Sequence, residues 1–169
     1  DEMRVQATKN SAEIRDAVEA GKKNYAGFEL PGRTLGVIGL GAIGRLVANA
    51  ALSLGMKVIG FDPGITVEGA WALSADVKKA NSVEELLRQV DFVTFHVPLV
   101  DATRNLINAE RLAMMKPGAF FINVARGKVM DEAALVSALH SKHLAGAALD
   151  VYEEEPLVNE ALFTMENVV

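Results

Sequence analysis

Apolar runs of strand length alternate along the chain with segments whose apolar residues recur at helical spacing. The predicted strands cover residues 34–39, 57–61, 91–95, 119–124 and 145–150, with a weaker one at 76–80, and the predicted helices cover residues 11–25, 43–54, 82–89, 109–114 and 131–141. Buried strands that alternate with helices are typical of a parallel sheet covered on both faces, with right-handed crossovers. We therefore expect an α/β fold built on a doubly wound parallel sheet.

Local signals support two of the predicted helix starts. Ser82 and Glu85 have the spacing of a capping box, and Ser11 is in place to cap the first helix. The stretch 63–75 carries the weakest pattern, and we expect its Trp71 to pack against a helix.

Composition and charge exclude several classes of protein. The 169 residues fit one domain, and 50% hydrophobic with 23% charged residues is ordinary for a globular protein. A net charge of −5 argues against nucleic acid or an anionic membrane as a partner, and the absence of cysteine excludes disulfides and thiolate metal sites. No apolar run reaches the roughly 18 residues that span a bilayer, and the N-terminus has no signal-peptide pattern. We expect a cytoplasmic protein.

The two ends of the sequence predict a piece of a longer protein. The chain starts at Asp1 rather than Met, and residues 166–169 have the character of the opening of another strand.

A glycine-rich turn follows the first predicted strand, and its residues are Gly39, Leu40, Gly41, Ala42, Ile43 and Gly44. In such a turn the first glycine permits the sharp exit from the strand, the second lets the backbone approach a pyrophosphate, and the third allows close packing of helix and sheet. The free N–H groups of the next helix face the phosphates. The pattern, set between strand and helix, predicts a dinucleotide site.

Asp62, at the end of the second predicted strand, indicates which dinucleotide binds. A carboxylate there accepts hydrogen bonds from the adenosine ribose hydroxyls and repels a 2′-phosphate, which favours NAD over NADP. The following Pro63 and Gly64 supply no basic residue for a phosphate. The alternative is that Asp62 only caps the next turn.

Polar residues also follow three later strands, at the side of the sheet where ligands bind in doubly wound folds. His96, Arg126 and Asp150 join Asp62 at this predicted rim. Arg126 ends an otherwise apolar strand and requires a partner, because an unpaired buried charge is costly. A substrate carboxylate suits its planar guanidinium, and a structural pair with Asp131 or Glu132 is an equal alternative.

Three consecutive acids, Glu153, Glu154 and Glu155, precede Pro156. We expect Glu153 and Glu154 to lie in a solvated turn, while Glu155 is placed to orient a catalytic imidazole. His140 and His143 sit at a helix end, where an interaction with the helix dipole is expected. No residues show metal-ligand spacing.

Over nearly its whole length the chain resembles the D-isomer-specific 2-hydroxyacid dehydrogenases. The motifs that carry the resemblance are Gly39-Leu-Gly-Ala-Ile-Gly44 with Asp62, His96-Val-Pro-Leu99, Asn123-Val-Ala-Arg-Gly-Lys-Val-Met-Asp131 and Ala145-Gly-Ala-Ala-Leu-Asp-Val-Tyr-Glu-Glu-Glu-Pro156. The resemblance implies a Rossmann-type domain that binds NAD and an enzyme that moves hydride between NAD and a 2-hydroxy or 2-keto acid. Within the family the chain is most similar to members that act on D-3-phosphoglycerate.

The resemblance also implies the roles of individual residues. Arg126 would bind the substrate carboxylate and carbonyl, Glu155 would hydrogen-bond the catalytic histidine and raise its pKa, and Asp150 would hold the nicotinamide carboxamide. The implied cofactor contacts are Gly39, Gly41, Ala42, Ile43, Gly44, Asp62, His96, Val97, Pro98, Val124, Ala125, Arg126 and Asp150.

The family pattern implies a division of the chain and a missing part. Residues 1–27 resemble the connecting helix that often lies at a dimer interface, and residues 28–169 resemble the NAD-binding domain. The catalytic histidine and the substrate domain would lie outside this stretch, so we expect the chain to bind NAD without turnover. Hydroxypyruvate, glyoxylate or D-lactate as substrate, and a non-catalytic NAD-sensing module, remain alternatives.

Overall fold

Six parallel strands form one sheet in the order β3-β2-β1-β4-β5-β6. The computed structural model describes residues 11–22, 27–154 and 159–169. The strands are β1 Thr34–Ile38, β2 Lys57–Phe61, β3 Lys78–Lys79, β4 Phe92–Phe95, β5 Ala119–Asn123 and β6 Leu144–Leu149. The order reverses direction at β1, between β2 and β4, which is the topological switch point of a doubly wound sheet. The predicted fold class is confirmed.

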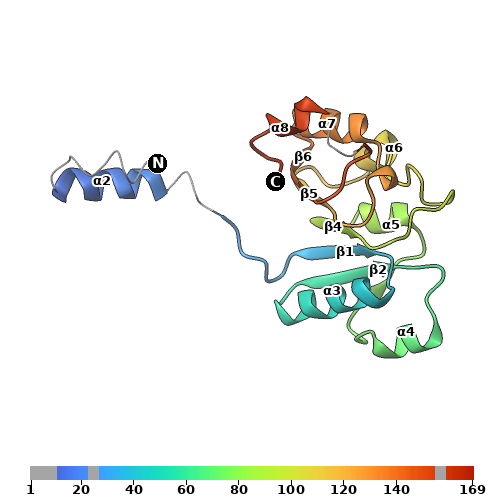
Figure 1. Ribbon diagram of the computed structural model, residues 1–169. Coiled ribbons are helices and arrows are strands. Elements are labelled where there is room, and N and C mark those ends of the chain that lie inside the picture. Colours follow the sequence, from blue (N-terminus) through green and yellow to red (C-terminus); the bar gives the residue numbers. More distant parts are fainter. Residues whose placement is uncertain (1–10, 23–26, 155–158) are drawn as a thin grey trace.

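The helices connect successive strands, apart from α2 before β1 and α8 after β6 (Figure 1). They are α2 Ser11–Lys22, α3 Ala42–Ser53, α4 Val67–Ala72, α5 Val83–Leu87, α6 Ala109–Ala113, α7 Glu132–His140 and α8 Glu160–Phe163, with the 3₁₀ helix η3 Gly127–Val129. The capping pattern at α5 is formed, because Ser82 Oγ accepts the Glu85 N–H at 3.1 Å. The Glu85 carboxylate reaches back to the N–H of Asn81, one residue earlier than in the usual capping box.

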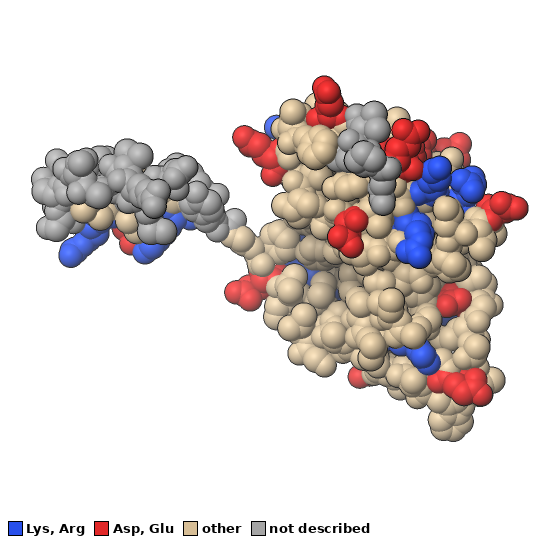
Figure 2. Space-filling model, viewed as in Figure 1, with Lys and Arg blue, Asp and Glu red and all other residues tan. Residues whose placement is uncertain are grey.

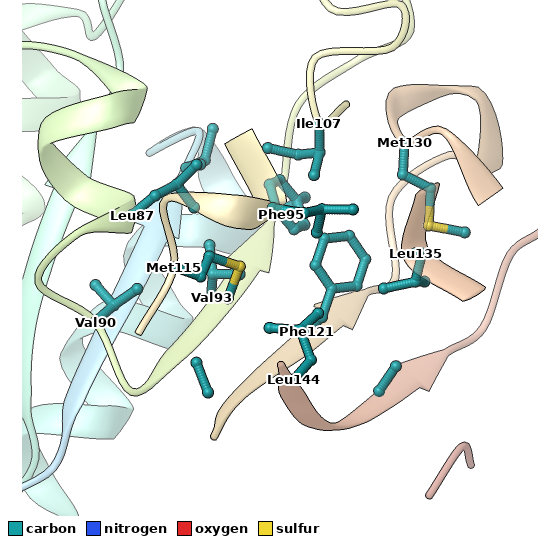
Figure 3. Packing of buried hydrophobic residues seen from close by; sticks show 14 of the residues in the cluster. Leu87, Val90, Val93, Phe95, Ile107, Met115, Phe121, Met130, Leu135 and Leu144 are labelled. Atoms are coloured by element: carbon teal, nitrogen blue, oxygen red, sulfur yellow. The ribbon is translucent and has the colours of Figure 1, made fainter. Parts of the chain in front are cut away.

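Side chains of successive strand residues point to opposite faces of the sheet, and on each face they form part of an apolar layer. Leu35 and Val37 of β1 pack with Ala48 of α3 on one face. On the other face, α5, α6 and α7 cover a larger cluster around Phe95 and Phe121, whose ring centroids lie 4.9 Å apart (Figure 3). This two-sided burial explains why the strands read as continuous apolar runs.

The predicted boundaries differ from the observed ones by a few residues at most, and three short elements were not predicted. These are α4, η3 and α8, each shorter than two helical turns, so that none of them can show a repeating apolar face. The expectation that Trp71 packs against a helix is wrong, since its side chain is 86% exposed. Its helix α4 approaches α3 through the buried Gly69, near Arg45, which leaves Trp71 on the outer side.

The last residues pair with the sheet, in agreement with their strand-like pattern. Val168 forms a parallel bridge with Ala147 of β6, and the Leu149 N–H donates to the Val169 carbonyl at 2.8 Å. Figure 1 shows α2 apart from the sheet.

Candidate functional site

The strand order brings the polar residues of the predicted rim to one edge of the sheet. Because all paired strands are parallel, their carboxyl ends meet there. Along this edge lie Asp62 after β2, the glycine turn after β1, His96 after β4, Arg126 after β5 and Asp150 after β6. The span from β2 to β5 covers three inter-strand spacings, roughly 14 Å. The edge is therefore long enough for an extended ligand.

Two glycines of the turn occupy positions that a side chain would disturb. Gly39 has a φ of +90°, and a Cβ on it would lie 2.5 Å from the carbonyl oxygen of His96. A Cβ on Gly44 would overlap the carbonyl oxygen of Gly39. The turn therefore lies tightly between α3 and the end of β4, as expected for the first and third glycines of the motif.

Gly41 has the opposite environment, with open space in front of it. It is exposed, and a Cβ on it would meet nothing within 4 Å. It is the N-cap of α3 and offers no side chain to the first-turn N–H groups. By contrast, side chains cap α4, α5, α6, α7 and α8. The free N–H groups of this helix start can bind the pyrophosphate of a dinucleotide, and the open space at Gly41 lets the pyrophosphate approach them.

Asp62 fastens the glycine turn to the end of β2. Its Oδ2 accepts the Leu40 N–H at 2.8 Å, and its Oδ1 accepts the Gly64 N–H at 2.8 Å. The turn-capping alternative is therefore observed, but it does not consume the carboxylate, because an ionised carboxyl has about four acceptor positions. A pocket of about 440 Å³ opens beside Asp62, and its lining includes Leu40, Ile65 and Lys79. This pocket lies where the adenosine of a dinucleotide is expected, beside the acid at the end of β2.

His96 closes the site on the β4 side. Its Nε2 lies 3.2 Å from Oγ1 of the buried Thr94. Burial lowers the pKa of His96 below its usual value, so the imidazole is neutral at pH 7. Val97 Cγ1 lies beside the Cα of Gly39, since a Cβ there would meet it at 2.9 Å, while the following Pro98 is exposed.

Arg126 lies on an exposed turn that a buried asparagine organises. Asn123, 0% exposed, donates from Nδ2 to the Arg126 carbonyl at 3.1 Å and accepts the Ala125 N–H at 3.1 Å. The expected burial of Arg126 is wrong, because Asn123 rather than Arg126 ends the buried strand. The Arg126 Nη1 donates to the Ala125 carbonyl at 2.7 Å, and Val124 is exposed beside it.

The structural ion pair weighed for Arg126 is not formed. Asp131 Oδ1 instead caps α7 through the Ala134 N–H, and Glu132 accepts the Glu153 N–H. The guanidinium is consequently presented to solvent at the rim. The sequence did not predict a role for Asn123. A polar residue at the end of an apolar strand is a signal from which this role could have been predicted.

The segment after β6 is tied to the Arg126 turn. Asp150 is exposed, and its N–H donates to the Asn123 carbonyl at 3.0 Å. The expectation of a solvated Glu153 is wrong, since Glu153 Oε1 accepts the Glu132 N–H at 3.0 Å. Glu154 is exposed as expected, and Glu155 lies outside the described residues.

The described part of the chain gives little support for a metal site or a membrane span. Among residues 11–22, 27–154 and 159–169, no group of three His, Cys, Asp or Glu could hold a metal ion. The described helices include none with the length and apolar character needed to cross a bilayer. His143 Nε2 lies 3.1 Å from the Leu112 carbonyl, between α6 and α7 and away from the rim.

Comparisons with known proteins agree with this geometry. Residues 2–169 match the family described as D-isomer specific 2-hydroxyacid dehydrogenase, NAD binding domain. The chain is 45% identical over 148 residues to D-3-phosphoglycerate dehydrogenase of Methanocaldococcus jannaschii, which covers 88% of this chain and 28% of that protein. It is 45% identical over 145 residues to glyoxylate reductase of Thermococcus kodakarensis, covering 86% of this chain and 43% of the relative.

A solved structure shows the same architecture. The apo form of D-mandelate dehydrogenase from Rhodotorula graminis superposes with a TM-score of 0.81 at 36% identity, covering 99% of this chain and 48% of that one. The chain thus spans less than half the length of each of these proteins.

Proposed function

The chain belongs to the D-isomer specific 2-hydroxyacid dehydrogenases through their NAD-binding domain, and we propose that it is the cofactor-binding half of such an enzyme. The observation that carries the proposal is the order of residues along the rim. The glycine turn and Asp62 lie at one end, and Arg126 with Asp150 lies on the last two strands at the other. An extended dinucleotide along this edge would have its adenosine beside Asp62 and its nicotinamide near Arg126.

Bound NAD would supply the acceptor for a hydride that leaves C2 of a 2-hydroxy acid. The chain's own residues would bind and orient. The Arg126 guanidinium, held on a turn fixed by Asn123, would bind the substrate carboxylate through two parallel hydrogen bonds. Asp150 would hold the carboxamide of the cofactor. Glu155 would hydrogen-bond a histidine from another part of the protein and stabilise its protonated form.

Exposed cations on two adjoining segments, one of them two residues after Arg126, support a substrate with a second anionic group. Arg104 and Lys128 are both exposed, and their segments lie side by side, since the Asn105 N–H donates to the Lys128 carbonyl at 2.9 Å. None of the ion pairs formed among the described residues uses either cation. We therefore favour D-3-phosphoglycerate, whose phosphate would meet these two cations. Glyoxylate, hydroxypyruvate and D-lactate offer no such group.

The proposal is tested with the full-length protein, by following NADH formation with D-3-phosphoglycerate, D-glycerate and D-lactate, and NADH consumption with hydroxypyruvate and glyoxylate. Arg126→Ala should lower kcat/KM about a hundredfold or more. Arg88→Ala, at an exposed arginine after α5, is the matched control. Full activity of Arg126→Ala would overturn the proposal, and preference for glyoxylate over the phosphorylated acid would overturn the substrate assignment.

We propose that residues 28–169 form the cofactor domain and residues 1–27 its connecting helix. A polypeptide of these 169 residues should bind NADH, as seen by fluorescence titration, without measurable turnover. General acid–base catalysis is worth about 10²–10⁴-fold, and positioning by a substrate domain adds to this. Robust phosphoglycerate oxidation by this polypeptide would show that the missing groups are not needed.

We further propose that the domain is cytoplasmic and that it mediates homodimer formation. The rings of Phe92 and Phe120 stack at 5.1 Å on the α3 side of the sheet, and Phe28, 49% exposed, packs on both. Figure 2 shows that the face carrying α3 is largely free of charged side chains. Phe28→Glu should halve the mass of the full-length protein in sedimentation, while Phe163→Glu, at another exposed phenylalanine, should not. An unchanged mass of Phe28→Glu would contradict this interface.

A further inference from the structure

At the edge of the site, the side chains of Glu132 and Glu153 each accept a hydrogen bond from the backbone N–H of the other residue. Glu132, the first residue of α7, is only 7% exposed. Its Oε1 accepts the Glu153 N–H at 2.8 Å, and Glu153 Oε1 accepts the Glu132 N–H at 3.0 Å. The pair joins the first turn of α7 to the segment that follows β6. The carboxylates lie at a helix start, where the dipole favours negative charge.

Glu132 makes a second contact with the same part of the chain. Its Oε2 accepts a hydrogen bond from Asn159 Nδ2 at 3.4 Å. Glu153 and Asn159 stand on either side of Glu155 in the sequence. One buried carboxylate therefore binds the chain both before and after the acid to which the proposed function gives a role.

The segment held by Glu132 also touches the Arg126 turn. A Cβ on Gly127 would overlap the carbonyl oxygen of Tyr152, so the two backbones are in direct contact. Gly127 directly follows Arg126, whose own carbonyl accepts from Asn123. The positions of Arg126 and of the chain at Glu153 are thus set by one connected group of contacts.

We propose that Glu132 is a positioning residue, which sets the segment of Tyr152 and Glu153, just before Glu155 in the sequence, against the Arg126 turn. The inference rests on the proposed function, because it requires Arg126 and Glu155 to act in one site. Loss of the Glu132 acceptor would leave the Glu153 N–H without its partner and release the segment. A displacement of about 1 Å of a catalytic group can cost on the order of a hundredfold in rate.

The test uses the full-length enzyme with Glu132→Asp, which keeps the charge but shortens the side chain, and with Glu132→Ala. Both should lower kcat about 10- to 100-fold and leave the KM for NAD within about twofold of wild type. Glu132→Gln keeps an acceptor oxygen, and its kcat should therefore stay close to that of the wild-type enzyme. Glu110→Asp, at the exposed first-turn acid of α6, should leave kcat unchanged. If the alanine variant does not fold, the aspartate variant decides.

Combination with Glu155→Gln separates this inference from the proposed function. If Glu132 acts through Glu155, the double variant Glu132→Asp/Glu155→Gln should be no slower than Glu155→Gln alone. A lowered melting temperature with wild-type kcat in Glu132→Asp, or additive effects in the double variant, would overturn the inference alone. Wild-type kcat in Glu155→Gln would overturn the proposed role of Glu155, and this inference with it.

Discussion

Substitution of two glycines in the same turn should separate cofactor binding from folding. A Cβ on Gly41 enters open space, and its φ of −66° suits alanine. Alanine is a poorer N-cap than glycine, but it restricts the unfolded chain, so Gly41→Ala should change stability by less than about 1 kcal/mol. The methyl group of the new alanine would occupy the space through which the pyrophosphate approaches the backbone. The Kd for NADH should rise at least about tenfold, equivalent to roughly 1.4 kcal/mol.

Gly44→Ala should instead damage the fold itself. Its Cβ would overlap the Gly39 carbonyl, which is backbone and cannot rotate away. Overpacking costs about 1–3 kcal/mol, partly offset by about 1 kcal/mol of helix propensity. The melting temperature should fall by several degrees, at roughly 2–4 °C per kcal/mol for a chain of this size. Thermal unfolding and NADH titration of both variants, with Gly21→Ala of α2 as control, provide the measurement. Wild-type NADH affinity in Gly41→Ala would refute the placement of the pyrophosphate.

Three further predictions follow from individual contacts. Asp62→Ser should lower the ratio of the Kd for NADP to the Kd for NAD at least about tenfold in binding titrations, because it removes the charge that repels a 2′-phosphate. An unchanged ratio of the two Kd values would contradict this role of Asp62. The Arg111 hydrogen bonds lower the pKa of Glu84 to about 2, so its contribution to stability is present above pH 4.5 and is lost toward pH 2. The urea midpoints of wild type and Glu84→Gln should therefore converge at low pH, and a constant difference would argue against this pair. Phe121→Ala, at a fully buried ring, should cost about 3–5 kcal/mol in urea unfolding.

The sequence predicted the sheet well because its signals are local. Strand β2 was predicted at its observed bounds, and the parallel arrangement followed from strands buried on both sides. The glycine turn also has a local cause, since Gly39 adopts a φ that other residues rarely take. The short helix α4 was missed because six residues hold less than two helical turns.

The errors concern side chains whose surroundings come from distant parts of the chain. Trp71 was expected to be packed, but the outer side of α4 has nothing to cover it. Arg126 was expected to be buried, yet the pairing of β5 with the distant strand β6 ends at Asn123, three residues earlier. Glu153 was expected in solvent, although the α7 helix start, 21 residues away in sequence, binds it.

By itself the sequence determined the fold class, the presence of a dinucleotide site and its position after the first strand, because periodicity and turn chemistry act over a few neighbouring residues. Only the tertiary structure decided what each polar group touches. It joined Asp62 to Leu40 across 22 residues and Glu132 to Glu153 across 21. Such contacts depend on how strands align and helices dock. That information resides in the packing of the whole sheet rather than in any one segment.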